Sequence, residues 1–321
     1  MTQPRHDSNG TVASPVRVVI GVITFRRPSG LRRLLESLRV LEFRESGLPG
    51  VEVVVVDNDA ERSGEAVCRD LRDFPWRVRY VSEARRGIPQ ARNAVLRVAL
   101  EDADFLAFID DDEAACPGWL DTLLAVQHRH EADVVGGPVL PVFVEPPPQW
   151  VVAGGFFNRA RHPTGTAVTP NGTGNVLIRV DAVRLCAVMF DERFALTGGS
   201  DTLFLEEMAR RGATVAWADE AVVWESIPTS RVSMVWLLRR AFRHGIVLGR
   251  IDGEFRVRYT SVLARLTKGL GQIAVGASLV LFSLCRQPLL TRGFQSVAKG
   301  VGGLVGLLGF RFNEYDTTHG E

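Results

Sequence analysis

The chain has 321 residues, of which 46% are hydrophobic and 23% are charged, and its formal net charge is +1. This composition is typical of a globular protein with one large domain, or with one domain and an appendage. The near-neutral total speaks against nucleic acid as a partner. The four cysteines lack CxxC spacing, which indicates neither a disulfide framework nor a zinc site and favours a reducing compartment.

The first part of the chain alternates between strand-like and helix-like segments. Residues 1–15 are polar and lack the apolar core of a signal peptide, so we expect a disordered lead. From residue 16 to residue 120, apolar β-branched runs alternate with amphipathic segments, which predicts right-handed βαβ units and a mostly parallel sheet with flanking helices. The predicted strands are 17–25, 51–59, 76–83 and 103–112, and the predicted helices are 31–41, 65–74 and 87–101.

The pattern loosens after residue 120. We expect, in order, a strand at 133–143, a proline-rich turn at 144–150, a Gly/Thr-rich loop and a strand within 161–183, a helix at 201–212 and strand-like chain at 213–226. Residues 16–228 are therefore predicted to form one α/β domain. Its two halves, 16–120 and 121–228, would bind a nucleotide-sugar and an acceptor, an assignment that depends on the family resemblance described below.

The C-terminal part, residues 229–321, has a different character. Residues 231–311 contain 13 Lys/Arg and 2 acidic residues, a net charge of +11, so the remainder carries −10. This asymmetry indicates an anionic partner, either a phosphorylated ligand or a lipid surface. A basic amphipathic helix is predicted at 232–250, followed by two Gly-rich apolar segments at 269–285 and 293–310.

The uncharged run 269–285 is at the lower length limit for crossing a bilayer. Its flanking cations, Lys268 and Arg286, favour helices that lie in the interface, or a shallow hairpin, at the cytoplasmic face of the membrane. The alternative is a pair of helices packed on the preceding domain.

Acidic residues cluster where a predicted buried strand ends. In an α/β sheet, ligands bind beyond the carboxyl ends of the strands. Asp110, Asp111, Asp112 and Glu113 follow one such strand directly, and clustered carboxylates are tolerated when a divalent cation neutralises them. The cluster therefore predicts a Mg²⁺ or Mn²⁺ site completed by substrate phosphates; the alternative is a solvated acidic turn.

Other polar residues are expected at the same edge. Asp57 ends the second strand, where an acid either contacts a ribose or base edge or caps a turn. An arginine of "EARRGIPQARN", which contains Arg92 and Asn93, is suited to bidentate contact with a diphosphate, unless it lies on a solvated helix face.

In combination these motifs resemble glycosyltransferase family 2, whose members have the GT-A fold and use nucleotide-diphospho-sugars. The matching stretches lie between residues 16 and 315. They are "VVIGVITFRRPSGLRRLLESL", "VEVVVVDND", "GIPQARNAVL", "FLAFIDDDEAACPGWL" and "TGGSDTLFLEEMARRG". The tail resembles the succinoglycan-biosynthesis branch of that family.

The resemblance implies roles for individual residues. A nucleotide pocket would contain Thr24, Arg26, Asp57, Arg92, Asn93, Asp110 and Asp111. Asp112, with Asp110, would be the metal ligand, and Asp201 of "GGSD" would be the general base on the acceptor hydroxyl, the alternative being a helix N-cap. Ser200 replaces the acid that usually precedes this base, and Glu113 departs from the usual final Asp of the metal motif.

The basic helix lacks the Q-x-x-R-W element of processive members, which favours transfer of one sugar per encounter. Its side chains would contact either the donor diphosphate or lipid headgroups. These side chains are Trp236, Arg239, Arg240 and Arg243.

The sequence therefore predicts an inverting, metal-dependent glycosyltransferase at the cytoplasmic face of a membrane. It would move a sugar from a nucleotide-diphospho-sugar, expected to be UDP-linked, to a lipid-linked or polysaccharide-precursor acceptor. The enzyme alternative is a nucleotidyltransferase, disfavoured because "TFRRPSG" has only one glycine. The non-enzyme alternative is a membrane-surface nucleotide-sugar sensor, which would not need Asp201.

Overall fold

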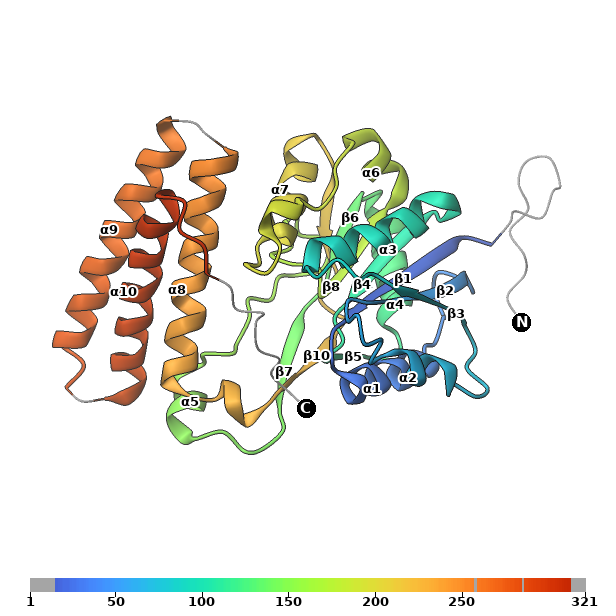
Figure 1. Cartoon of the computed structure of the whole chain (residues 1–321), viewed down its shortest axis with the longest axis horizontal. Helices are drawn as coiled ribbons and strands as arrows, with labels where there is room; N and C mark the ends of the chain where they lie inside the picture. Colours follow the sequence, from blue (N-terminus) through green and yellow to red (C-terminus); the bar gives the residue numbers. More distant parts are fainter. Residues whose placement is uncertain (1–14, 257–258, 285, 313–321) are drawn as a thin grey trace.

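The computed structural model describes residues 15–256, 259–284 and 286–312. An α/β body and a group of three long helices lie side by side (Figure 1). A seven-stranded sheet forms the centre of the α/β body. Its strands are β1 (Arg17–Thr24), β2 (Gly50–Asp57), β3 (Arg77–Ser82), β4 (Phe105–Ile109), β6 (Val134–Gly136), β8 (Asn175–Arg179) and β9 (Val215–Trp217).

The strand order is β3-β2-β1-β4-β8-β6-β9. The chain first builds outward from β1 to β3 and then returns to place β4 on the other side of β1, so the order reverses between β1 and β4. Strands β1 to β4 are parallel, whereas β8 runs antiparallel to both β4 and β6. The predicted α/β fold and mostly parallel sheet are thus confirmed, and the switch point of strand order falls where the acidic run begins.

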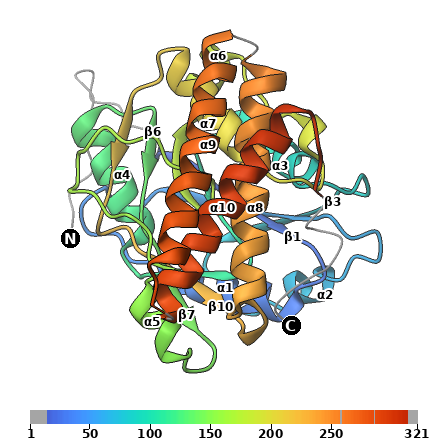
Figure 2. The ribbon, with the colours of Figure 1, turned by 90° about the vertical axis from the view of Figure 1, so that its left-hand side faces the viewer.

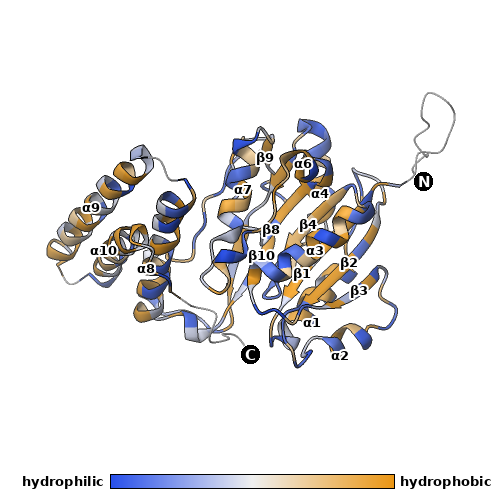
Figure 3. Cartoon of the chain, turned by 45° about the horizontal axis from the view of Figure 1, so that its top comes forward, coloured by the Kyte–Doolittle hydropathy of each residue, from blue (hydrophilic) through white to orange (hydrophobic). Residues whose placement is uncertain are grey.

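Helices cover both faces of this sheet. One core lies between the sheet and α1 (Pro28–Arg39), α2 (Glu65–Arg69) and α4 (Trp119–His130). The other lies between the sheet and α3 (Ile88–Asp102), α6 (Val180–Cys186) and α7 (Ser200–Arg210). Because both faces are covered, the central strands are apolar on both sides, as Figure 3 shows.

A second, three-stranded sheet was not predicted. It contains β5 (Glu113–Ala115), β7 (Val139–Phe143) and β10 (Val223–Ile227), in the order β5-β10-β7. The strand expected at 133–143 is split, because Gly137 and Pro138 separate β6 from β7 and the two strands join different sheets. The expected proline-rich turn ends where α5 (Gln149–Gly154) begins.

The C-terminal segments form α8 (Met234–Arg250), α9 (Tyr259–Leu281) and α10 (Gln287–Leu307), with a π-helical turn at Ile251–Phe255 after α8. Ser233 caps α8 by accepting a hydrogen bond from the Trp236 amide. Helix α10 packs against both α8 and α9 (Figures 1 and 2).

Two of these helices are longer than the apolar runs that predicted them. Helix α9 begins ten residues before the uncharged run 269–285, because Leu and Arg residues extend its periodic pattern. Within the described residues, no helix combines the length and the apolar character needed to cross a membrane. The boundary predicted near residue 228 stays a prediction.

Candidate active site

Asp111 joins the ends of the two strands at the switch point. Its side chain is buried, and it accepts hydrogen bonds from Thr24 Oγ1 at 2.8 Å and from Arg27 Nη1 at 2.9 Å. Burial raises the pKa of Asp111 to about 7, although the Arg27 guanidinium acts in the opposite direction. Asp111 therefore holds β1 and β4 together at their carboxyl ends.

Asp112 contacts two cations. Arg27 Nη1 and Arg231 Nη2 both donate to Asp112 Oδ2, each at 3.1 Å. Arg27 thus bridges two consecutive carboxylates, of which Asp111 is the more deeply buried.

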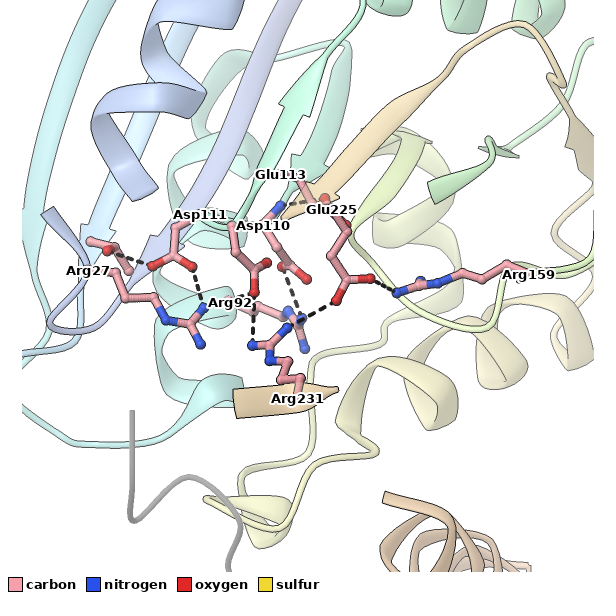
Figure 4. A network of polar contacts seen from close by, with 10 residues as sticks. Arg27, Arg92, Asp110, Asp111, Glu113, Arg159, Glu225 and Arg231 are labelled. Carbon is pink, nitrogen blue, oxygen red and sulfur yellow. Dashed lines mark hydrogen bonds and ion pairs between the residues drawn. The ribbon is translucent and has the colours of Figure 1, made fainter. Parts of the chain in front are cut away.

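The second sheet supplies further charged groups (Figure 4). Glu225 on β10 lies opposite Glu113 on β5 and accepts hydrogen bonds from Arg159 and, at 3.2 Å, from Arg231 Nη1. Glu113 is buried, accepts a hydrogen bond from the Asp110 amide at 3.0 Å, and has a pKa raised well above its usual value by burial and then by Asp110. Glu113 therefore has a structural role, because it holds the backbone of the acidic run in place.

Two cavities meet at this network. The first, of about 290 Å³, is lined by residues at the carboxyl ends of β1 and β2 and on α3, including Thr24, Phe25, Asn58 and Arg92. The second, of about 710 Å³, extends between the α/β body and helices α8 and α10. Six residues line both cavities: Asp110, Asp112, Arg159, Glu225, Arg240 and Arg243.

Asp201 lies on the wall of the second cavity, in the first turn of α7. The preceding glycines, Gly198 and Gly199, have positive φ angles of 73° and 102°, which suit glycine and turn the chain into the helix. Arg92 lies between the two acidic groups, with Nη2 3.6 Å from Asp110 Oδ1 and Nη1 3.9 Å from Asp201 Oδ2. Arg92 thus links Asp201, the candidate base in the second cavity, to Asp110, which lines both cavities.

Of the expected nucleotide contacts, Thr24, Arg92, Asp110 and Asp111 line the first cavity. Asp57 is fully buried, and its carboxylate accepts hydrogen bonds from the backbone N–H groups of Asp59 at 3.0 Å and Gly64 at 2.7 Å, and from Tyr80 Oη at 3.0 Å. The structure therefore places Asp57 as the organiser of a loop, whereas its neighbour Asn58 lines the cavity.

Three more expected residues lie outside the cavity walls. Arg26 has a half-exposed side chain that pairs with Asp59 at 3.3 Å. The Asn93 amide is buried and bonds both the N–H and the C=O of Phe190, so it fixes α3 to a neighbouring loop. Arg239 is exposed on α8. By contrast, Trp236, Arg240 and Arg243 line the first cavity.

Sequence reasoning missed three members of the network, namely Arg159, Glu225 and Arg231. All three lie far along the chain from the acidic run and are brought to it by the fold around the second sheet. No local sequence motif therefore indicates them.

The donor groups fit a divalent cation only in part. Within the described ranges, no three His, Cys, Asp or Glu side chains are arranged to bind a metal ion. Mg²⁺ and Mn²⁺ need only one or two protein carboxylates when substrate phosphates supply further oxygen ligands. Asp110 and Asp112 meet that requirement, because both line the space where the two cavities join.

Comparison with known proteins agrees with this geometry. The family model described as Glycosyl transferase family 2 matches residues 19–185, which contain the acidic run and α3. The chain is a family 2 glycosyltransferase. This glycosyltransferase is 36% identical over 240 residues to the succinoglycan biosynthesis protein ExoM of Rhizobium meliloti, covering 74% of the chain and 76% of that relative.

More distant relatives share parts of the chain or its fold. A glucosyl-dolichyl phosphate glucuronosyltransferase of Haloferax volcanii is 28% identical over 136 residues, covering 42% of this glycosyltransferase and 41% of that protein. Structures of S. aureus TarS 1-349 in complex with UDP and with UDP-GlcNAc have TM-scores of 0.54 and 0.53 and identities of 18% and 16%, and each comparison covers 92% of both chains. At that identity the likeness shows the fold alone.

Proposed function

We propose that this glycosyltransferase moves a sugar from a UDP-sugar to a hydroxyl group of an acceptor for polysaccharide synthesis, in one displacement that inverts the anomeric configuration. The observation that carries the proposal is that two cavities meet at Asp110 and Asp112. The smaller cavity, at the switch point, suits the nucleotide, and the larger one suits a saccharide acceptor. The likeness to ExoM and to TarS structures that hold UDP and UDP-GlcNAc supports this donor and this pathway class.

In this proposal Asp201 is the general base. It takes the proton from the acceptor hydroxyl as that oxygen bonds to the anomeric carbon, and the bond from this carbon to the diphosphate oxygen breaks. UDP leaves with the electron pair. Arg92 lies between Asp110 and Asp201, so its positive charge would offset the repulsion between the two carboxylates.

The leaving diphosphate carries the charge that develops in the reaction. Arg27 and Arg231, already directed at Asp112, and Arg240 in the cavity wall are placed to stabilise it. A divalent cation held by Asp112 and Asp110 would add Lewis-acid stabilisation of the same charge.

We also propose that α9 rests on the cytoplasmic face of a membrane, where a lipid-linked acceptor would be available. Leu263, Leu266 and Leu270 share one face of α9 and are exposed, as are Phe282 and Leu284 just after it. Flotation of the protein with phosphatidylglycerol vesicles tests this. Binding that a Leu266→Asp and Leu270→Asp double variant abolishes is expected, and wild-type protein that stays with the soluble fraction contradicts membrane association.

The function itself is tested with Asp201→Asn. We expect UDP affinity to be unchanged and sugar transfer, measured with a purified precursor acceptor, to fall by about 10² to 10⁴-fold, as for loss of a general base. Asp181→Asn, an exposed acid on α6, is the matched control. Unchanged turnover in Asp201→Asn contradicts the assigned base, and a wild-type protein that binds UDP but transfers no sugar supports a sensor.

A further inference from the structure

The π-helical turn Ile251–Phe255 follows α8 and packs against α7, the helix whose first turn contains the base candidate. Turns of this kind are rare in proteins and are frequently found at functional sites. Ile251 is buried in a small apolar cluster with Phe194 and Leu203. Because Leu203 follows Asp201 by two residues on α7, this cluster supports the helix close to the base candidate.

The turn is also attached to the loop that precedes Asp201. Arg250, the last residue of α8, donates to Thr197 Oγ1 at 2.9 Å, and its guanidinium lies 5.1 Å from the centroid of the Phe194 ring. Phe255, at the other end of the turn, stacks on the same ring, with the two centroids 4.9 Å apart. Residues at both ends of the turn therefore hold the loop that leads to the base candidate.

Asp252, inside the turn, is a buried carboxylate that the proposed reaction does not use. It accepts hydrogen bonds from Arg256 Nη1 at 2.9 Å and from Arg265 Nε on α9 at 2.6 Å. Arg256 also pairs with Glu206 on α7. A buried charge is stable only when it is paired, so these contacts are strongly favoured. The four side chains thus form a continuous network from α9 to α7.

This network reaches α7 beyond its first turn. Glu206 follows Asp201 by five residues, which corresponds to ~7.5 Å along a helix axis. The contacts of Arg250 hold the loop before α7, and Arg256 holds the middle of the helix, so together they fix the tilt of α7. General-base catalysis requires the base to lie within hydrogen-bond reach of the proton that it takes, so the tilt of this helix matters for the reaction.

We propose that Asp252 and Arg256 are positioning residues, which hold Asp201 in place by tying α7 to the group formed by α8, α9 and α10. The proposal rests on the proposed function, because it names the residues that position the base assigned there. Both residues lie outside the two cavities, so they act through α7 and touch neither substrate. The helical group is then needed for turnover, apart from any contact that it makes with a membrane.

The first experiment uses Arg256→Gln in the full chain. Asp252 keeps Arg265 as its counter-charge in this variant, so the buried acid stays paired. We expect kcat for transfer to the purified precursor acceptor to fall roughly tenfold, because a small misplacement of a reacting group is costly. UDP affinity, measured by calorimetry, should be unchanged. Arg256→Lys should restore part of kcat, since the positive charge remains.

Glu207→Gln is the matched control, because it removes the neighbouring acid of α7, which pairs with Arg210 within the same helix. It should turn over as the wild type does. Glu206→Gln tests the same link from the side of α7, and the Arg256→Gln and Glu206→Gln double variant should be no slower than Arg256→Gln alone. Unchanged kcat in Arg256→Gln, or an equal loss in Glu207→Gln, overturns the positioning role.

Hydrogen exchange gives a second measurement that does not depend on turnover. The Thr197 amide donates to the Phe194 carbonyl oxygen at 2.7 Å, in the loop that the turn holds. Its exchange should be several times faster in Arg256→Gln than in the wild type or in Glu207→Gln. Equal exchange in all three proteins contradicts the proposed link.

Asp201→Asn, measured in the same transfer assay, separates the two possible failures. Normal turnover by Asp201→Asn contradicts the base assignment, and therefore the proposed function itself. Loss of turnover in Asp201→Asn together with normal turnover in Arg256→Gln overturns only the positioning role of Asp252 and Arg256.

Discussion

The buried carboxylate of Asp111 predicts an unusual pH dependence of stability. Its pKa is raised to about 7 in the folded chain, mainly by burial, whereas an unfolded aspartate titrates near its ordinary value of 3.8. The folded state therefore holds this proton more tightly, and the contribution of Asp111 to stability falls as pH rises from about 4 to 7. Between pH 5 and pH 8 these two values give a loss of roughly 2 to 3 kcal/mol.

The substitution that tests this is Asp111→Asn. An asparagine keeps its carbonyl oxygen for Arg27 and turns its amide toward Thr24, whose hydroxyl can also accept, so both contacts survive. The free energy of unfolding is measured by urea denaturation at pH 5 and pH 8, with EDTA present to remove metal. The variant should gain roughly 2 to 3 kcal/mol relative to the wild type between those pH values. An equal change in both proteins, or a relative loss in the variant, refutes the reasoning.

Two further substitutions test how α8 supports the site. Arg250 is fully buried, donates to Thr197 Oγ1 at 2.9 Å beside the loop of the base candidate, and pairs with Glu254. Arg250→Met should lower the free energy of unfolding by about 3 kcal/mol in urea denaturation. It should also reduce kcat by a larger factor than it changes the donor KM, and Arg250→Lys should restore part of kcat. A change in KM alone contradicts this positioning role. Gly245→Ala should lower the melting temperature by several degrees in calorimetry, because its Cβ meets the backbone of Lys299; an unchanged melting temperature contradicts the tight helix contact.

The first half of the sheet was predictable because its strands are buried on both faces. Runs such as "VVVV" in β2 have no polar face, and that pattern is typical of parallel strands between helical layers. The direction of β8 was not predictable, since an antiparallel strand in the same layer has the same apolar composition. The division at Gly137 and Pro138 depends on a distant contact, because a Cβ on Gly137 would lie 2.5 Å from the Ala221 carbonyl oxygen.

Part of the candidate site could likewise be predicted from the sequence, and part could not. The run Asp110–Asp112 is local and could be recognised in the sequence. The further partners of its carboxylates, Thr24 for Asp111 and Arg231 for Asp112, are supplied by the fold and could not be predicted. Asp57 illustrates the reverse case. The turn interpretation that sequence reasoning left open matches its hydrogen bonds to the 59–64 loop, whereas the ribose contact stays a prediction.

Calorimetric titration of UDP into the full chain, with and without Mn²⁺, tests the central claim most directly. If the acidic run binds a metal together with the donor diphosphate, the wild type should bind UDP tightly only with Mn²⁺. Asp112→Ala should lose that metal-dependent gain, and Asp181→Ala, an exposed acid on α6, should keep it. UDP binding that does not require Mn²⁺ and is unchanged in Asp112→Ala would contradict the account and leave these acids as a polar turn held by Arg27 and Arg231.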